Sequence, residues 1–328
     1  MQLFLKRVFI WFVATAAFLF ICLQAVFYLY KILPNDISRT QIIFSTLKDT
    51  SVQPSIIILG DSRAVFGIDA KAISKNLPGQ ALAYNLASVG QSVQEGAHFF
   101  TMLSPSVKHV LHCIPFENFA LTHIRLPDNK AVAMRMYGYS LDTATEKIVQ
   151  EVNPILHQSK WHVAFQARNL LISSLNVIVR EMLDDEKFNN NFHDLYFPHI
   201  YTTSRHPRYP FNGHSINFDS LKVNPLLTNL VQRVHNYCKQ RDIFYHVVLM
   251  PMNPDVPVPT TAVRNTYLTE VRKQLPSVDI MDMAQELVPT EFYDWLHPNK
   301  AGAEKLSIAI ANLLKEHYKL SDKTSSNK

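Results

Sequence analysis

The pattern of hydrophobic and polar positions begins with one continuous apolar stretch. Val8 to Tyr30 is a run of 23 residues without a charged side chain. At about 1.5 Å per residue, a helix of that length would cover roughly 35 Å, enough to cross the hydrocarbon core of a bilayer. Lys6 and Arg7 precede the run, and Lys31 follows it. Basic residues ahead of a span favour a cytoplasmic N-terminus and export of the chain that follows.

A cleaved signal peptide is the alternative interpretation of this segment. The run is longer than the apolar region of a normal signal peptide, and no small-x-small cleavage site follows it before Pro34-Asn35-Asp36. Cys22 is not preceded by a small residue, as a lipoprotein signal would require. We therefore expect a retained single-pass anchor in the inner (cytoplasmic) membrane of a bacterium, with the rest of the chain in the periplasm or outside the cell.

Five short apolar runs after the anchor are typical of buried parallel strands. The first, Ser55–Leu59 (SIIIL), is rich in β-branched residues and ends at Gly60. The others have the same character: Leu82–Ala87, Lys108–Pro115, Tyr245–Met252 and Val278–Met283. Helical patterns lie between several of them, one opened by Asn224-Pro225 and the last by Pro298. Repeated βα units predict an α/β fold with a parallel sheet of about five strands, and ligands then lie beyond the carboxyl ends of the strands.

The same pattern predicts the domain organisation. We expect four parts: a cytoplasmic N-terminus and transmembrane anchor in residues 1–34, a linker in 35–52, the α/β domain in 53–316, and a polar C-terminal tail in 317–328 that is frayed from Ser321 to Lys328. Between the third and fourth strands lies a long insertion, at about residues 117–222. We expect a packing helix near Trp161–Met182 in its first half. Its second half is aromatic and rich in histidine, with little regular pattern.

Composition excludes several classes of function. Hydrophobic residues make up 47% and charged residues 18% of the 328 positions, which excludes disorder over most of the chain. The net charge of +5 falls short of a nucleic-acid-binding signature. The three cysteines make neither a disulfide framework nor a zinc motif, and we expect Cys113 and Cys238 to be buried thiols. We expect no cofactor.

The insertion carries residue types that also occur in binding sites. Four histidines lie in its second half: His193, His199, His206 and His214. No carboxylate or cysteine stands at ligand spacing from them, so we do not expect a metal site. Arg205 and Arg208 lie among tyrosines, which is compatible with binding of a sugar or an anionic polymer. The alternative for this segment is a solvated irregular loop.

The first of three motifs at strand ends is Gly60-Asp61-Ser62, directly after the first strand. A serine on the turn from a strand into a helix has an exposed hydroxyl, and the start of the helix offers free backbone N–H groups. This position suits a nucleophile with an oxyanion donor beside it. The tripeptide alone is common, and a loop with a helix N-cap serine is the alternative.

The second motif is an Asp-x-x-His just before the last helix. Pro298 disfavours helical geometry at His297, so the imidazole is expected in an extended loop. Asp294 can curl back to hold the Nδ1–H of His297, which leaves Nε2 to take the proton of a serine. In a sheet ordered 2-1-3-4-5, this loop lies near the loop after the first strand. The motif is therefore more specific than the tripeptide, although an isolated histidine in a loop usually has no catalytic role.

The third motif is an Asn-x-x-x-x-Gly stretch from Asn85 to Gly90, at the end of the second strand. A glycine lets its backbone N–H approach a tetrahedral oxyanion without a Cβ in the way. By itself, the motif is only a glycine in a loop.

Taken together, the three motifs resemble the SGNH (GDSL-type) hydrolases in order and spacing, over about residues 53–118 and 242–316. The resemblance implies a flavodoxin-like three-layer α/β/α fold. It also implies Ser62 as nucleophile, His297 as base and Asp294 as the acid that orients the base. The backbone N–H groups of Ser62 and Gly90 would form part of the oxyanion hole.

One block departs from the family pattern. The family usually has Gly-x-Asn-Asp after the third strand, where the asparagine completes the oxyanion hole. Here the segment is Ile114-Pro-Phe-Glu-Asn118-Phe119, so Asn118 is the nearest match and comes late, without the glycine. Losing one oxyanion donor typically costs about 3 kcal/mol, which affects rate more than the triad. The chain is similar here to membrane-anchored members that act in O-acylation of envelope polymers.

These observations predict a membrane-anchored serine esterase or O-acyltransferase, acting through an acyl-serine on acyl esters, preferably O-acetyl esters, of an exported polysaccharide. The resemblance also implies a multi-spanning O-acyltransferase as a partner. From the net charge we expect no nucleic-acid partner. Two alternatives stay open. One is a plain periplasmic esterase or lysophospholipase, and the other is a non-catalytic accessory protein with the same fold in a glycan acylation complex.

Overall fold

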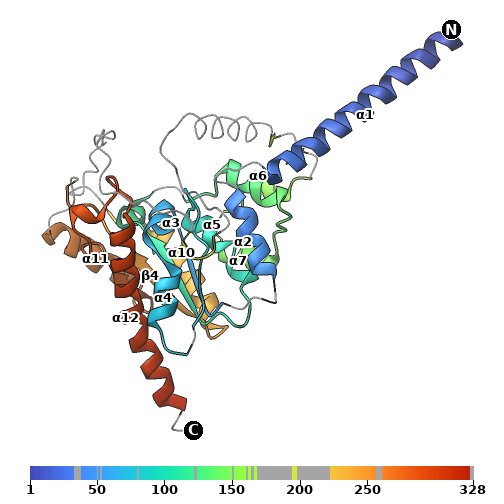
Figure 1. Ribbon diagram of the computed structural model, residues 1–328. Coiled ribbons are helices and arrows are strands. Elements are labelled where there is room, and N and C mark those ends of the chain that lie inside the picture. The colour runs from blue at the N-terminus through green and yellow to red at the C-terminus, as the bar shows by residue number, and fades with distance from the viewer. Residues whose placement is uncertain are drawn as a thin grey trace. The chain divides into compact units, whose positions relative to one another are not determined.

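The computed structural model (Figure 1) describes most of the chain outside the second half of the insertion. The described residues are 1–32, 38–49, 51, 54–79, 81–121, 124–149, 151–159, 162–163, 166–167, 194–197, 222–255 and 261–325. They belong to two compact units. The first comprises Met1–Phe44, Pro127–Leu141 and Asn153–Lys187, and the second comprises Ser45–Leu126, Asp142–Val152 and Phe188–Lys328. The insertion therefore contributes to both units.

The second unit is an α/β structure built on a parallel sheet of five strands. The strands are β1 (Ile56–Gly60), β2 (Ala83–Asn85), β3 (His109–Ile114), β4 (Phe244–Leu249) and β5 (Asp279–Asp282). Their order is β2-β1-β3-β4-β5, and every neighbouring pair is parallel. Each residue of β1 and β3 is buried, as expected for strands covered on both faces. The predicted strands and their order are confirmed.

Helices cover the sheet of the second unit. They are α3 (Ser62–Gly67), α4 (Ala70–Asn76), α5 (Val93–Ala97), α7 (Thr143–Ile148), α10 (Pro225–Lys239), α11 (Thr261–Gln274), α12 (Lys300–Ser325) and the 3-10 helices η1 (Phe100–Met102), η2 (Phe116–Ala120) and η5 (Pro289–Glu291). Figure 1 shows α12 beside α4, and the two helices are in contact. Alternate residues of β1, Ile56 and Ile58, share a core with Phe66 of α3 and with Leu306 and Ile310 of α12. These contacts fix α3 and α12, which flank the candidate site.

The first unit contains α1 (Gln2–Ile32), most of α2 (Ser38–Lys48), α6 (Asp128–Met136) and the 3-10 helix η3 (Pro154–His157). Within α1, the stretch Phe4–Cys22 has a mean hydropathy of 1.9 and is not buried, so this helix is long and apolar enough to cross a membrane. A signal sequence would have the same properties. Of the helices in the part of the chain described, α1 alone meets this criterion.

The expected linker at residues 35–52 contains a packed helix, α2. Ile43 and Phe44 are buried, and the ring of Phe44 stacks on that of Tyr139 at 5.5 Å between centroids. Part of this stretch is therefore packed helix, because a short apolar group such as Ile42-Ile43-Phe44 is enough to bury one side of a helix when a partner is present.

The expected frayed tail also differs, because α12 continues to Ser325. No proline or glycine interrupts the sequence from Ala303 to Ser325, so nothing in the chain ends the helix where its apolar pattern stops. The helix expected near Trp161–Met182 lies outside the described residues apart from 162–163 and 166–167. The four histidines of the insertion, with Arg205 and Arg208, also lie outside the described residues.

Candidate active site

The structure brings Ser62, His297 and Asp294 together at the carboxyl end of the sheet. Ser62 Oγ lies 2.9 Å from His297 Nε2, although 235 positions separate the two residues. His297 Nδ1 lies 2.8 Å from Asp294 Oδ2. Because a carboxylate only accepts hydrogen bonds, Nδ1 carries the proton, and the neutral imidazole then accepts the hydroxyl proton of Ser62 at Nε2. This is the arrangement of a serine, a base and an orienting acid.

Asp294 is held by more than the imidazole. Its Oδ1 accepts hydrogen bonds from the backbone N–H groups of Leu296 and His297, each at 2.8 Å. Burial by itself raises the pKa of the Asp294 carboxyl, but the hydrogen bond and charge of His297 and the two backbone donors outweigh it, so the pKa lies below its ordinary value. Asp294 is therefore a stable anion that fixes the tautomer of His297.

The loop that carries His297 is tied down on several sides. Tyr293 N–H donates to the carbonyl of His297 at 2.8 Å, and the amide of Asn253, in the loop after β4, donates to the carbonyl of Asp294 at 3.0 Å. The ring of Phe66 meets the imidazole edge-on at 4.9 Å between centroids. Such contacts hold the base before a substrate arrives, which is the condition for efficient proton transfer.

Ser62 is the first residue of α3, and Asp61 is its N-cap. Asp61 Oδ1 accepts the backbone N–H of Arg63 at 3.0 Å, so the capping role belongs to the aspartate and leaves the hydroxyl of Ser62 to His297. Burial raises the pKa of the Asp61 carboxyl, and the nearby charge of Arg63 partly offsets this effect. Ser62 is therefore not the N-cap of α3, and its hydroxyl faces the imidazole of His297.

The loop after β2 is joined to the residue just before this turn. Gly60 N–H donates to Gln91 Oε1 at 2.7 Å, and the backbone N–H of Ser88 donates to the carbonyl of Gly60 at 3.1 Å. Gly90 lies between these two anchors, is exposed and has φ +66°. The loop with the proposed backbone donor is thus fastened two residues from Ser62. Gln91 was missed by the sequence analysis.

The asparagine of the third motif has a structural role. Asn85 is fully buried, and its side-chain amide donates to the carbonyls of Ala64 and Ile68 at 3.0 and 2.9 Å. Its carbonyl oxygen accepts the backbone N–H of Ala87 at 3.0 Å. Asn85 therefore joins the end of β2 to α3, the helix that begins at Ser62.

Asn118, the expected third oxyanion donor, lies in η2 directly after β3 and is half-buried. Its side-chain amide has no hydrogen bond to any residue in the described ranges. The neighbouring Glu117 forms a bidentate ion pair with Arg63, the residue after Ser62. This pair was not predicted from the sequence, although two opposite charges at the ends of adjacent strands were a signal for it.

The chain was compared with known proteins. No family model matches it, and no curated protein matches it at a significant level. A chemical interpretation therefore depends on the residues themselves and on their geometry.

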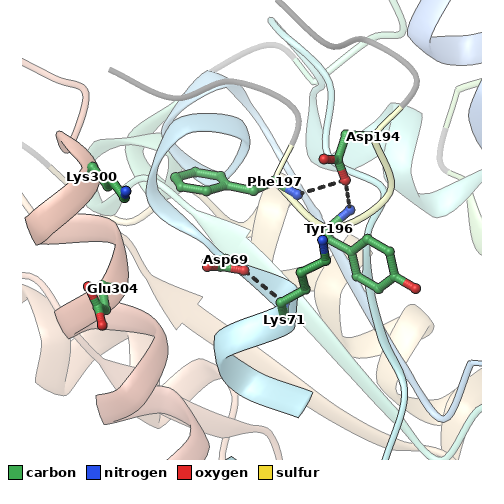
Figure 2. Close-up of a pocket in the computed structure, with 7 residues that line it drawn as sticks. All are labelled: Asp69, Lys71, Asp194, Tyr196, Phe197, Lys300 and Glu304. Carbon is green, nitrogen blue, oxygen red and sulfur yellow. Dashed lines mark hydrogen bonds between the residues drawn. The ribbon is translucent and has the colours of Figure 1, made fainter. Parts of the chain in front are cut away.

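A pocket of about 180 Å³ includes Lys300, at the start of the helix that follows the loop of His297. Its lining residues come from α4 and its N-cap, from residues 194–197 and from the first turns of α12: Asp69, Lys71, Asp194, Tyr196, Phe197, Lys300 and Glu304. Figure 2 shows the ring of Phe197 above Asp69, with α12 on the other side of the pocket. Lys300 follows His297 by three residues, and a Cβ on Gly67 would lie 2.9 Å from Pro298 Cγ. The pocket lining combines five charged side chains with two aromatic rings.

Possible metal ligands and the two buried cysteines are the remaining reactive groups in the described residues. Within the described ranges, no group of three or more histidines, cysteines and carboxylates is placed to hold a metal ion. Cys113 and Cys238 are buried as expected, and burial raises the pKa of both thiols, that of Cys238 to about 12. Neither thiol is therefore a ready nucleophile.

Proposed function

We propose that this chain is a serine esterase or O-acyltransferase related to the SGNH hydrolases. The observation that carries the proposal is the continuous hydrogen-bonded series from Ser62 Oγ through His297 to Asp294, with lengths of 2.9 and 2.8 Å. An arrangement of nucleophile, base and orienting acid is the general signature of covalent catalysis by serine. The strand order further supports a flavodoxin-like three-layer fold, in which ligands lie at the carboxyl ends of the strands.

The chemistry follows from the positions of the three groups. Ser62 Oγ attacks the carbonyl carbon of an ester while its proton passes to His297 Nε2. When the tetrahedral intermediate collapses, the bond to the leaving oxygen breaks and His297 returns the proton to that oxygen. Water or a sugar hydroxyl then attacks the acyl-serine, its proton passes to His297, and the released Ser62 regains a proton from the imidazole. Asp294 stays ionised and stabilises the imidazolium in both halves.

The negative oxygen of the intermediate needs donors fixed in advance. We infer that the backbone N–H groups of Ser62 and Gly90 supply two of them, supported by the hydrogen bonds that join Gly60 to the loop of Gly90. Asn118 would supply a third from the loop after β3.

The preferred substrate is an acyl ester, in particular an O-acetyl ester, of an exported polysaccharide. The charged side chains in the lining of the pocket that contains Lys300 favour it over a lipid ester. The helix α1 is suited to keep the catalytic unit at a membrane, where an exported polysaccharide passes. In this proposal the N-terminus is cytoplasmic, the catalytic unit faces the periplasm or cell exterior, and a multi-spanning O-acyltransferase is the acyl-donating partner.

A non-catalytic accessory role in such an acylation complex is the second candidate. The irregular block around Asn118 favours it, because an incomplete oxyanion hole lowers turnover.

A fluorophosphonate probe on the full chain in detergent separates these functions. Ser62 Oγ would form a bond to phosphorus, fluoride would leave, and the hydroxyl proton would pass to His297. We expect a labelled peptide containing Ser62 under conditions that label a control esterase. Absence of that adduct would defeat the enzymatic proposal and favour the accessory role. Mass spectrometry of envelope glycans from cells with and without active Ser62 then gives the direction: extra acyl groups in the mutant indicate hydrolysis, and missing ones indicate transfer.

The pocket gives a prediction about substrate size. Replacing Lys300 with alanine should raise KM for an acetylated oligosaccharide about fivefold, because one exposed charge-assisted hydrogen bond contributes about 1 kcal/mol. The rate with a small aryl acetate, which would not reach the pocket, should stay the same. Lys239→Ala, an exposed lysine near the end of α10, is the matched control. Equal effects of Lys300→Ala on both substrates would show that the pocket does not bind the glycan.

A further inference from the structure

The Arg63–Glu117 ion pair joins two loops that carry proposed catalytic groups. Arg63 Nη2 contacts Glu117 Oε1, and Nη1 lies 3.3 Å from Oε2, so the contact is bidentate. The exposed fractions of the two side chains are 9% and 17%. Arg63 directly follows Ser62, and Glu117 directly precedes Asn118. The pair therefore spans from the turn after β1 to the turn after β3, which are adjacent strands.

Stability alone is a weak reason for such a pair. Desolvation of two charges largely cancels their attraction in a protein interior, and well-packed apolar residues often replace a buried pair without loss of stability. What the pair supplies is geometry, because a planar guanidinium on a carboxylate fixes both distance and orientation. Here the fixed quantity is the separation between the Ser62 turn and the Asn118 turn.

The charge of Arg63 has a second consequence. The carboxyl of Asp61 lies near the charged side chains of Arg63 and Glu117 and near the imidazole of His297, and it also acts on the buried thiol of Cys113. Two carboxylates, those of Asp61 and Glu117, thus lie beside the place where the proposed reaction generates a negative oxygen. Arg63 offsets both, and without it their field would oppose the oxyanion and favour the protonated imidazole.

We propose that Arg63 and Glu117 are positioning residues for the oxyanion hole, which hold the turn of Asn118 against the turn of Ser62 and keep this end of the sheet from being strongly negative. The inference rests on the proposed function, since it assigns a role within the same site. It explains how the segment around Asn118, which lacks the family's usual glycine, is kept in place. The ion pair, and not the local backbone geometry, holds this segment.

The test uses Arg63→Met in the full chain, with Arg264→Met as a matched control. Arg264 forms an ion pair with Asp282 between α11 and β5, and the exposed fractions of those side chains, 10% and 18%, are almost the same as in the first pair. We expect kcat for a small aryl acetate to fall about a hundredfold in Arg63→Met, the loss typical when a reacting group moves by about 1 Å, with little change in KM. Arg264→Met should keep kcat within about twofold while losing comparable thermal stability.

Three further measurements separate a role of the ion pair in catalysis from a role in stability alone. Arg63→Lys keeps the positive charge but cannot bind the carboxylate through two parallel N–H groups, so it should recover part of kcat. Glu117→Gln should lose activity although Arg63 is intact. The acidic limb of kcat/KM should move to higher pH in Arg63→Met, by about half a unit or more, because the uncompensated carboxylates stabilise the imidazolium. The limb of Arg264→Met should not move.

The outcomes are distinguishable from failure of the proposed function. If wild-type Ser62 is not labelled by the fluorophosphonate, the catalytic proposal fails, and this inference fails with it. If wild type is labelled and turns over while Arg63→Met behaves as Arg264→Met does in kcat and in pH profile, the ion pair is only structural and the inference alone is overturned.

Discussion

Replacing Ser62 with alanine should abolish probe labelling and lower kcat for an ester by at least about 10⁴-fold. Among the described residues, the hydroxyl of Ser62 forms a hydrogen bond to His297 alone, and Asp61 supplies the helix cap, so the fold should be kept. We expect an unchanged melting temperature within about 2 °C by circular dichroism. Ser92 provides the contrast, because its hydroxyl accepts the N–H of Glu95 as the N-cap of α5. Ser92→Ala should cost about 1 kcal/mol of unfolding free energy.

The second half of this prediction concerns coupling. If Ser62 and His297 act as one unit, His297→Ala should cost nearly as much as Ser62→Ala, and the double variant should be hardly worse than either. Additive losses in the double variant would mean that the two side chains act separately despite their contact. Full activity in either single variant would show that another group is the nucleophile or the base.

Much of this arrangement was accessible from the sequence. The strands are short apolar runs such as Ser55–Leu59, whose all-buried character leaves few other structures for them. Once the strand order is assumed, the turn after β1 and the loop before α12 lie at the same end of the sheet. Because β3 and β4 separate their strands, the contact between them also depends on the path of the loop. Asp294 reaches His297 across three positions, so that hydrogen bond needs little tertiary information.

The parts that escaped prediction depend on contacts between distant loops. Gln91 reaches Gly60 and Arg63 reaches Glu117 only because β2 and β3 flank β1 at a particular register, which no local pattern specifies. The helix α2 was not predicted for a related reason. Phe44 is buried because it packs against Tyr139 of the insertion, and the local sequence does not show that contact. The strands and the three motifs could thus be predicted from sequence patterns. The contacts that hold the loops of the site together depend on tertiary structure.

Among these loop contacts, those made by Gly60 should be the most sensitive to substitution. It ends β1 with φ +152°, a backbone conformation that residues with a side chain rarely adopt. A Cβ there would lie 2.8 Å from both Cys113 Cβ and Cys113 O on β3, and 2.9 Å from Ala64 Cβ. Gly60→Ala therefore combines backbone strain with overpacking against a central strand, and we expect it to lower the unfolding free energy by about 4 kcal/mol.

Gly79→Ala is the control that separates the two contributions. Gly79 has φ +73°, and a Cβ there would have no atom within 4 Å, so only the backbone strain remains and the expected cost is about 1 kcal/mol. Urea denaturation of the two variants measures the difference. Because Gly60 also binds Gln91 and Ser88, any folded Gly60→Ala protein should have lost activity as well, through a shift of the Gly90 loop away from Ser62. Equal stability of the two variants would mean that β1 and β3 can separate at this point, and the turn that presents Ser62 would then not be rigidly held.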